Sequence, residues 1–408
     1  MLTGWWKRYG DLAALFFLHG MAMGMWFVPL GTVLDAHGLQ GIKPFAFGTA
    51  AVASFFSPLL FGAISDRHLG PVRVLRGLAL ATAAAMALAA MAIGHGWPAW
   101  LVLTCIQAHA LCSSPTWSIS STIVFSGLEN ASKEFGPIRA MGTLGWVAGC
   151  WVVSALGADT SPVAGYAGAV LWLVVFAYTF VLPQVKLKKT EERLSLRQRF
   201  GLDALVLLRQ PDHRVVFITA ALFSIPLAAF YPFTPTHLRQ LGLVHTTAWM
   251  TVGQATEIAA MLGLGRLLGM WRLKWIFATG LAFGLLRYAL CTFDGMMPVL
   301  AGVFLHGFAF TLFYITAQIY LEERVETTWR GRAQALMYLM NGGVGNLCGY
   351  LGTGAWLEVC RGPDGLVRWP KFWGGLAVVV AVVLGSFLLA YRGQRHGGVM
   401  GAPAAPAK

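Results

Sequence analysis

The chain has 408 residues, of which 57% are hydrophobic and 12% are charged, and its formal net charge is +13. A soluble domain has roughly 25% charged residues, so this composition excludes an ordinary water-soluble protein and indicates a protein embedded in lipid. The basic excess does not indicate nucleic-acid binding, because no basic stripe is interleaved with stacking aromatic residues.

Twelve apolar segments are long enough to cross a membrane, since a spanning helix needs about 20 mostly apolar residues. None alternates apolar and polar residues with period two, which excludes a membrane barrel. The predicted fold class is an all-α membrane protein with twelve transmembrane helices. In chain order they cover residues 10–34, 42–64, 73–94, 98–125, 137–157, 164–183, 214–238, 246–268, 274–293, 297–321, 332–357 and 372–391.

The longest polar interruption follows the sixth segment and is rich in Lys and Arg. We therefore predict an N-terminal six-helix bundle at 1–183, a cytoplasmic linker at 184–213, a C-terminal six-helix bundle at 214–392 and a disordered tail at 393–408. With the N-terminus inside, about 23 of the basic residues lie on the cytoplasmic side and about 5 outside. This asymmetry predicts that both termini are cytoplasmic.

The loop between the second and third predicted spans combines glycines, an acid and arginines. Glycine allows close helix approach, aspartate can cap a helix and pair with a cation, and arginine holds the cytoplasmic side. The expected structural residues are Gly62, Asp66, Arg67, Gly70 and Arg73. The loop resembles the signature G-x-x-x-D-R-x-x-G-x-x-R of the major facilitator superfamily. A degenerate copy at 265–274 fits two pseudo-symmetric halves.

Glu257 is the acidic residue nearest the middle of a predicted span. A charged carboxylate at membrane depth is costly, so a functional role is the default interpretation. We predict that Glu257 couples transport to protons and contacts substrate, with a structural ion pair as the alternative. Gln254 lies three residues earlier on the same helix face, where it could contact substrate or a neighbouring helix.

Further candidates lie in four other predicted spans. Arg139, Thr143 and Trp146 are spaced i, i+4, i+7 and share one helix face, although Arg139 could instead be a cytoplasmic anchor. The tenth span offers an aromatic wall or, equally, a packed helix face. The full set of substrate-binding candidates is Arg139, Thr143, Trp146, Tyr231, Gln254, Glu257, His306, Phe310, Thr311, Tyr314 and His19.

Other chemistry is not indicated. The six cysteines show no C-x-x-C spacing, so we expect no disulfide framework, metal site or cofactor. Hydrolase, zinc-protease and P-loop motifs are missing from the sequence, so an enzyme or an ATP-driven pump is not expected. Arg287 in the ninth span is interpreted as a structural partner or as a side chain that reaches out to the membrane surface. Gly142, Gly145 and Gly149 are expected to serve close helix packing.

Several segments spread over most of the chain resemble the nucleoside–proton symporter family of the major facilitator superfamily. The most specific are the P-I-R-x-x-G-T-x-G run from Pro137 and the Q-x-x-E pair of Gln254 and Glu257. The resemblance implies a site between the halves and nucleoside uptake driven by a proton gradient. It also implies ligand contacts by Arg139, Thr143, Trp146, Gln254 and Glu257. The chain departs from the family pattern where Thr311 replaces an expected carboxylate.

These observations predict proton-coupled import of nucleosides by alternating access. The expected location is the bacterial inner membrane, with a multi-pass, monomeric chain in the lipid bilayer. The expected partners are a nucleoside-like small molecule and protons, and no nucleic acid. Two alternatives stay open. One is a carrier for another small polar solute, such as a sugar or a cell-wall fragment, and the other is a substrate sensor that does not transport.

Overall fold

The computed structural model describes residues 2–67, 70–129, 131–184, 202–327 and 329–393, without the side chains of residues 2–7, 57–67 and 131–133. Within these ranges the regular structure is helical, apart from one isolated bridge between Arg361 and Val367. Each of the twelve predicted segments falls on one helix or on consecutive helices. The all-α prediction is therefore confirmed.

In the first half, most predicted spans form a single helix. The elements are α1 (Leu2–Phe27), α2 (Leu30–Ala36), η1 (Gln40–Ile42), α3 (Lys43–Arg67), α4 (Pro71–Gly94), α5 (Ala99–Ser126), α6 (Ala131–Ala155) and α7 (Val163–Tyr178). The break between α1 and α2 falls at Pro29, which has no N–H for the helical ladder. Pro71 starts α4, where a missing N–H costs nothing.

The second half is more broken. Its elements are η2 (Leu202–Arg209), α9 (Pro211–Leu227), α10 (Phe230–Gln240), α11 (Thr246–Trp249), α12 (Val252–Met270), α13 (Leu273–Cys291), α14 (Met296–Phe310), η3 (Thr311–Ile315), α15 (Thr316–Arg324), α16 (Arg330–Tyr338), η4 (Leu339–Gly345), α17 (Asn346–Val359) and α18 (Trp369–Ala390). Both η3 and η4 are π-helical turns inside longer helices. Such turns occur frequently at functional sites.

Seven helical stretches among the described residues are long and apolar enough to cross a membrane by length and composition. They are Arg8–Ala36, Pro71–Gly94, Glu134–Ala155, Pro211–Gln240, Leu273–Cys291, Met296–Arg324 and Trp369–Ala390. The chain is thus a multi-pass membrane protein. The count of twelve spans, the domain boundaries and the cytoplasmic position of both termini stay predictions.

Close packing of α1 against α6 depends on glycine. A Cβ added at Gly145 would lie 2.7 Å from the carbonyl carbon of Phe17, and one added at Gly24 would lie 2.6 Å from the carbonyl oxygen of Trp146. At Gly149 the added atom would collide with the Met21 carbonyl oxygen. The predicted packing role of the α6 glycines is confirmed, and it fixes the helix that carries Arg139, Thr143 and Trp146.

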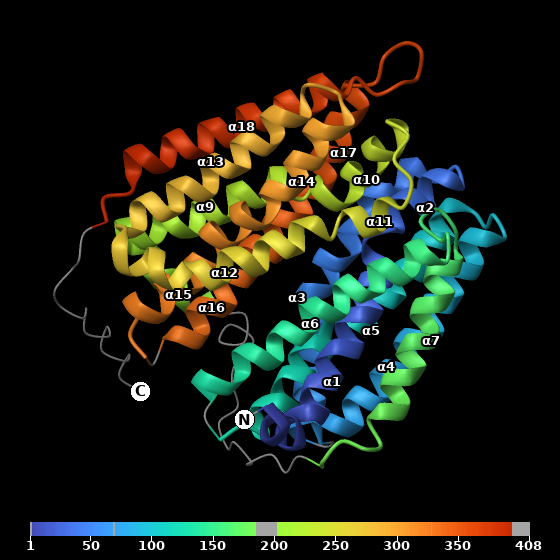
Figure 1. The fold of residues 1–408 in the computed structure, drawn as a ribbon, viewed down its shortest axis with the longest axis vertical. Coiled ribbons are helices and arrows are strands. Elements are labelled where there is room, and N and C mark those ends of the chain that lie inside the picture. Colours follow the sequence, from blue (N-terminus) through green and yellow to red (C-terminus); the bar gives the residue numbers. More distant parts are fainter. Residues whose placement is uncertain (1, 68–69, 130, 185–201, 328, 394–408) are drawn as a thin grey trace, which may run out of the picture.

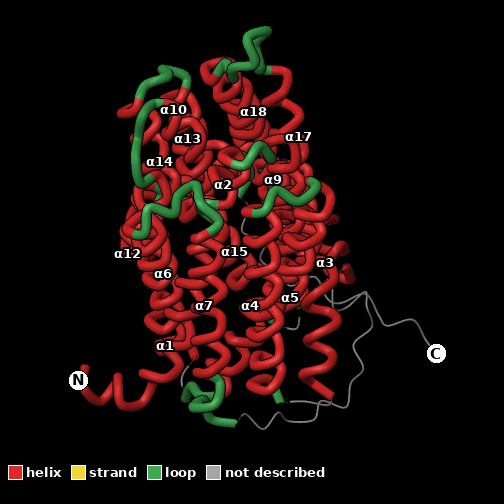
Figure 2. Tube along the Cα trace, turned by 90° about the vertical axis from the view of Figure 1, so that its right-hand side faces the viewer, coloured by secondary structure: helices red, strands yellow, loops and turns green. Residues whose placement is uncertain are grey.

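The two halves meet at one end of the molecule. There α2 contacts α10, α6 contacts α11, and α3 packs along η4 and α17. Figure 1 shows α2, α10 and α11 together at this end, far from the N-terminus. Figure 2 shows the helices side by side, with loops at the two ends of the bundle. We call the end formed by α2, α10 and α11 the closed end.

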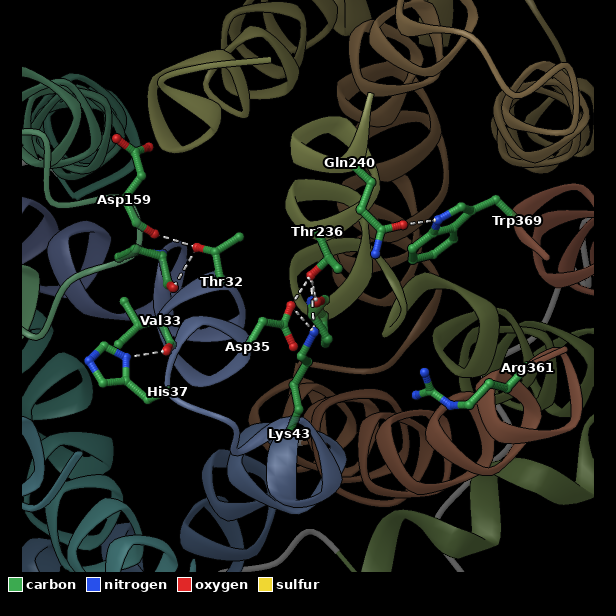
Figure 3. A network of polar contacts seen from close by, with 12 residues as sticks. Thr32, Val33, Asp35, His37, Lys43, Asp159, Thr236, Gln240, Arg361 and Trp369 are labelled. Carbon is green, nitrogen blue, oxygen red and sulfur yellow. Dashed lines mark hydrogen bonds and ion pairs between the residues drawn. The ribbon is translucent and has the colours of Figure 1, made fainter. Parts of the chain in front are cut away.

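Two polar clusters join the halves at the closed end, and Figure 3 shows the first of them, formed by Asp35, Lys43 and Thr236. In one, Lys43 Nζ lies 2.6 Å from Asp35 Oδ2 and donates to Thr236 Oγ1 at 3.0 Å, while the Thr236 hydroxyl donates to Asp35 at 2.7 Å. Lys43 is only 2% exposed. Burial is tolerated because its charge is paired and hydrogen-bonded.

In the other cluster, the loop after α6 binds the second half. Asp159 Oδ1 accepts from the Thr247 backbone N–H at 2.7 Å and from Ser154 Oγ at 2.9 Å. The Ser154 hydroxyl in turn accepts from the Ala248 N–H at 3.0 Å. Hydrogen bonds to a charged group are stronger than neutral ones, so this cluster stabilises contact between the halves.

We expect Thr236→Val to loosen the closed end, because it removes two hydrogen bonds beside a buried ion pair at a cost of about 1 kcal/mol or more. Spin labels at Leu156 and Val244, which are both exposed on opposite halves, should then show a larger long-distance population. Thr104→Val, an exposed threonine bonded only to its own helix among the described residues, is the control. An unchanged distance distribution in Thr236→Val would contradict a holding role for this cluster.

The signature loop is described only in part. The side chains of Gly62, Asp66 and Arg67 and the whole of residues 68–69 lie outside the described residues. Gly70 has φ −61° and ψ 149°, which any residue can adopt, and its predicted structural role stays a prediction. Arg73 is exposed on α4. Residues 185–201 of the predicted linker and 394–408 of the predicted tail also lie outside the described residues.

Candidate functional site

The face of α6 that carries Arg139, Thr143 and Trp146 looks toward the second half. The Arg139 side chain is exposed, and its guanidinium lies 4.6 Å from the ring centroid of Trp117. The Thr143 hydroxyl makes no hydrogen bond in the described part of the chain, and neither does the buried indole N–H of Trp146. Buried donors are usually partnered, so this N–H is available to a ligand or water.

Across the interface, α10 and α12 supply Tyr231 and Gln254. The Gln254 amide donates from Nε2 to the Tyr231 hydroxyl at 2.9 Å. Its Oε1 is buried and has no partner among the described residues. The Tyr231 ring lies 6.0 Å from the Trp146 ring and 5.2 Å from that of Phe27, centroid to centroid. Aromatic contact therefore joins the halves beside an unused amide acceptor.

Glu257 lies one helical turn from Gln254 and is half-buried. It makes no ion pair within 4.0 Å in the described part of the chain, but it attracts Arg139 electrostatically. The backbone of Glu257 is held by α14, because Gly307 packs directly on its N–H and on the Gly253 carbonyl. A carboxylate and a guanidinium from opposite halves thus attract each other without an ion pair within 4.0 Å among the described residues.

An aromatic group extends the site along α14. The His306 ring stacks on Phe230 with centroids 3.8 Å apart and 14° between planes, and it lies 6.2 Å from Phe310. Phe310 is half-buried and also contacts Tyr314 at 5.4 Å. Flat apolar walls of this kind suit a planar ligand.

Three further candidates are buried: Tyr314 and Thr311 in the second half and His19 in the first. The Tyr314 hydroxyl is bonded to Ser224 at 2.8 Å, and Thr311 is fully buried and donates to the Glu257 carbonyl at 3.4 Å. His19 is also fully buried, with Nδ1 at 3.1 Å from Ser120 Oγ and Nε2 at 2.9 Å from Thr116 Oγ1. Their polar atoms are engaged within the protein, so a ligand role for them stays a prediction with less geometric support.

Sequence reasoning left two roles open for Arg287 and missed its partner. The structure supports the structural role, because Arg287 is 2% exposed and its Nη1 lies 2.6 Å from His306 Nδ1. The outward reach is therefore wrong, because aromatic side chains enclose the guanidinium. Nothing in the spacing of residues 287 and 306 signals this contact, since it joins two different helices.

The arrangement offers hydrogen-bond donors, acceptors and one carboxyl group between two helical halves. The described residues contain no cluster of three His, Cys, Asp or Glu side chains that could hold a metal ion. Polar groups at the contact of two helical halves in a membrane protein are typical of secondary transporters. The model of the family "Nucleoside H+ symporter" matches residues 9–396, and the chain belongs to this family.

Related proteins and structures match along almost the whole chain. YegT of Escherichia coli (strain K12) is 32% identical over 407 residues, covering 95% of this chain and 94% of that protein. The xanthosine permease of the same organism is 25% identical over 396 residues, covering 91% and 94%. A crystal structure of a variant of the nucleoside transporter NupG superposes with a TM-score of 0.86 at 24% identity, covering 94% and 99%. The predicted family is confirmed.

Proposed function

We propose that the protein imports nucleosides together with protons across the bacterial inner membrane by alternating access. The observation that carries this is a set of groups between the halves without a hydrogen-bond partner among the described residues: the Trp146 N–H, the Gln254 carbonyl, the Thr143 hydroxyl and the Glu257 carboxyl group. A nucleoside offers a flat base and ribose hydroxyls that complement these groups. The names of the xanthosine permease and of NupG support the substrate class.

The contacts between the two halves support one conformational state of an alternating-access cycle. The halves touch through α2, α10 and α11, far from the start of α1, whereas Arg139 near the start of α6 stays exposed. If both termini are cytoplasmic, this is a state closed to the outside. Rocking of the halves about Trp146 and Tyr231 would then break the clusters of Asp35 and Asp159 and expose the site outward.

Glu257 and Arg139 give a physical link between protons and the site. A charged Glu257 attracts Arg139 from the opposite half, and a protonated Glu257 does not. Protonation also removes a charge that is costly at membrane depth. Proton binding therefore weakens the attraction between the halves at the end where Arg139 lies and leaves the guanidinium free to bind substrate.

Uptake into proteoliposomes tests this function directly. Radiolabelled uridine, adenosine and xanthosine should each be offered with and without an inward proton gradient, and unlabelled sugars should be used as competitors. We expect gradient-stimulated accumulation of at least one nucleoside, with no competition by sugars. Absence of stimulated uptake for every nucleoside would reject the substrate assignment, and binding without flux would favour the sensor.

Trp146→Phe should weaken nucleoside binding about tenfold, because it keeps the aromatic ring but removes the buried N–H, and a lost hydrogen bond costs about 1 kcal/mol or more. Calorimetric titration of detergent-purified protein with uridine measures the change. Trp100→Phe is the matched control, since Trp100 is 68% exposed at the start of α5. Equal affinity of both variants would remove the Trp146 N–H from the site.

A further inference from the structure

Arg287 is a buried cation without a carboxylate partner in the described part of the chain. It is 2% exposed, and its guanidinium carbon lies 4.5 Å from the ring centroid of Phe230 and 4.8 Å from that of Tyr288. Its Nε has no hydrogen-bond partner among the described residues. Its one hydrogen bond among the described residues is donated by Nη1 to His306 Nδ1 at 2.6 Å. Burying an unpaired charge is costly, so the hydrogen bond to His306 contributes much of the stabilisation of the Arg287 guanidinium.

This contact fixes the protonation of His306. A guanidinium has five N–H donors and no acceptor, so His306 Nδ1 must accept and cannot carry a hydrogen. A doubly protonated imidazolium has no acceptor to offer and would repel Arg287. His306 is therefore neutral, and its single ring hydrogen sits on Nε2.

The remaining nitrogen lies beside the candidate site. His306 is sandwiched against Phe230, and its ring centroid is 6.3 Å from that of Tyr231, whose hydroxyl holds Gln254. A Cβ added at Gly253 would lie 3.4 Å from the His306 ring, so α12 passes close to it. No hydrogen bond joins His306 Nε2 to a protein atom among the described residues. It is thus a donor without an acceptor there, beside the Tyr231 side chain that holds Gln254.

We propose that Arg287 is a positioning residue that holds His306 as the neutral Nε2–H tautomer, so that His306 donates a hydrogen bond to an acceptor atom of the nucleoside base. This rests on the proposed function, because it names how the same site recognises its substrate. Together with Gln254 Oε1, an acceptor, the His306 donor gives a pair of opposite polarity that can select among base edges.

The charged and titratable groups around His306 are few. Among the described residues, α13 supplies Arg287 and Tyr288, and α10 supplies Tyr231. The Glu257 carboxylate of α12 interacts electrostatically with Tyr231. Arg287 alone among these contacts the ring nitrogen. Its removal should therefore free His306 Nδ1 to carry the ring hydrogen, whereas Arg287→Lys keeps a donor at this place.

Nitrogen NMR of protein with ¹⁵N-labelled histidine tests the tautomer without any substrate. The His306 signals, assigned by their loss in His306→Gln, should show a bare Nδ1 and a protonated Nε2 that do not change between pH 5.5 and 8, a range of about 2.5 units around the usual histidine value. Arg287→Met should shift these signals toward those of the tautomer with hydrogen on Nδ1, and Arg287→Lys should not. A His306 that titrates in the unsubstituted protein, or that carries its hydrogen on Nδ1, would overturn the proposal.

Two substitutions separate donation to substrate from support of Arg287. His306→Asn keeps an acceptor near the Nδ1 position but loses the Nε2–H donor, whereas His306→Gln places an amide N–H near Nε2. We expect uridine affinity to fall about tenfold or more in His306→Asn and clearly less in His306→Gln. The reverse order would show that His306 only supports Arg287. If the unsubstituted protein binds no nucleoside, the proposed function fails while the NMR result still decides the tautomer.

Discussion

Glu257→Gln should abolish proton-driven accumulation of nucleoside while leaving exchange of labelled for unlabelled nucleoside measurable. The amide keeps the size and hydrogen-bonding capacity of the protonated acid but cannot release a proton. Because Glu257 is the acid that faces Arg139 between the halves, its loss removes the group through which a proton can change their attraction. We expect gradient-driven accumulation to fall at least about tenfold, which corresponds to about 1.4 kcal/mol.

The measurement is uptake into proteoliposomes with and without a pH gradient, paired with counterflow exchange. Glu326→Gln is the control, because Glu326 is an exposed acid in the loop after α15. Normal accumulation by Glu257→Gln would remove this residue from coupling. Loss of exchange as well would show that Glu257 acts mainly in binding.

Gly145→Ala should destabilise the whole first half. The added methyl group would lie 2.7 Å from the Phe17 carbonyl carbon and 3.0 Å from the Met21 nitrogen, and both are backbone atoms that cannot rotate away. Overpacking of a close-packed contact typically costs about 1–3 kcal/mol, and a backbone collision lies at the upper end. We also expect weaker nucleoside binding, since α6 carries Arg139, Thr143 and Trp146.

Thermal unfolding of the purified protein in detergent measures this effect. Gly136→Ala on the same helix is a matched control, because a Cβ there would meet nothing within 4 Å. A melting temperature for Gly145→Ala equal to that of the control would show that α1 and α6 are not as closely packed as the structure has them.

Properties that depend on local pattern could be predicted from the sequence. The length of the apolar segments predicted where the helices lie, since a helix needs about 20 apolar residues to cross the lipid bilayer. Helical spacing placed Arg139, Thr143 and Trp146 on one face, and the structure turns that face toward Gln254 and Glu257. These predictions succeed because each depends on residues a few positions apart.

Contacts between distant segments could not be predicted in this way. The partnership of Arg287 with His306 depends on how α13 and α14 pack, and the bond from Lys43 to Thr236 depends on how the two halves meet. His19 was predicted to bind substrate because its hydrogen-bond partners Thr116 and Ser120 lie 97 and 101 residues away in the sequence. Side chains that satisfy one another across helices leave no periodic signal.

A structure of the protein with bound uridine, determined by electron cryomicroscopy in a lipid nanodisc, tests the central claim most directly. The account predicts density for the nucleoside between α6 and α12, with contacts to the Trp146 N–H, Gln254 Oε1 and the Glu257 carboxyl group. Uridine bound elsewhere, or bound between the halves without touching any of these three side chains, would contradict it.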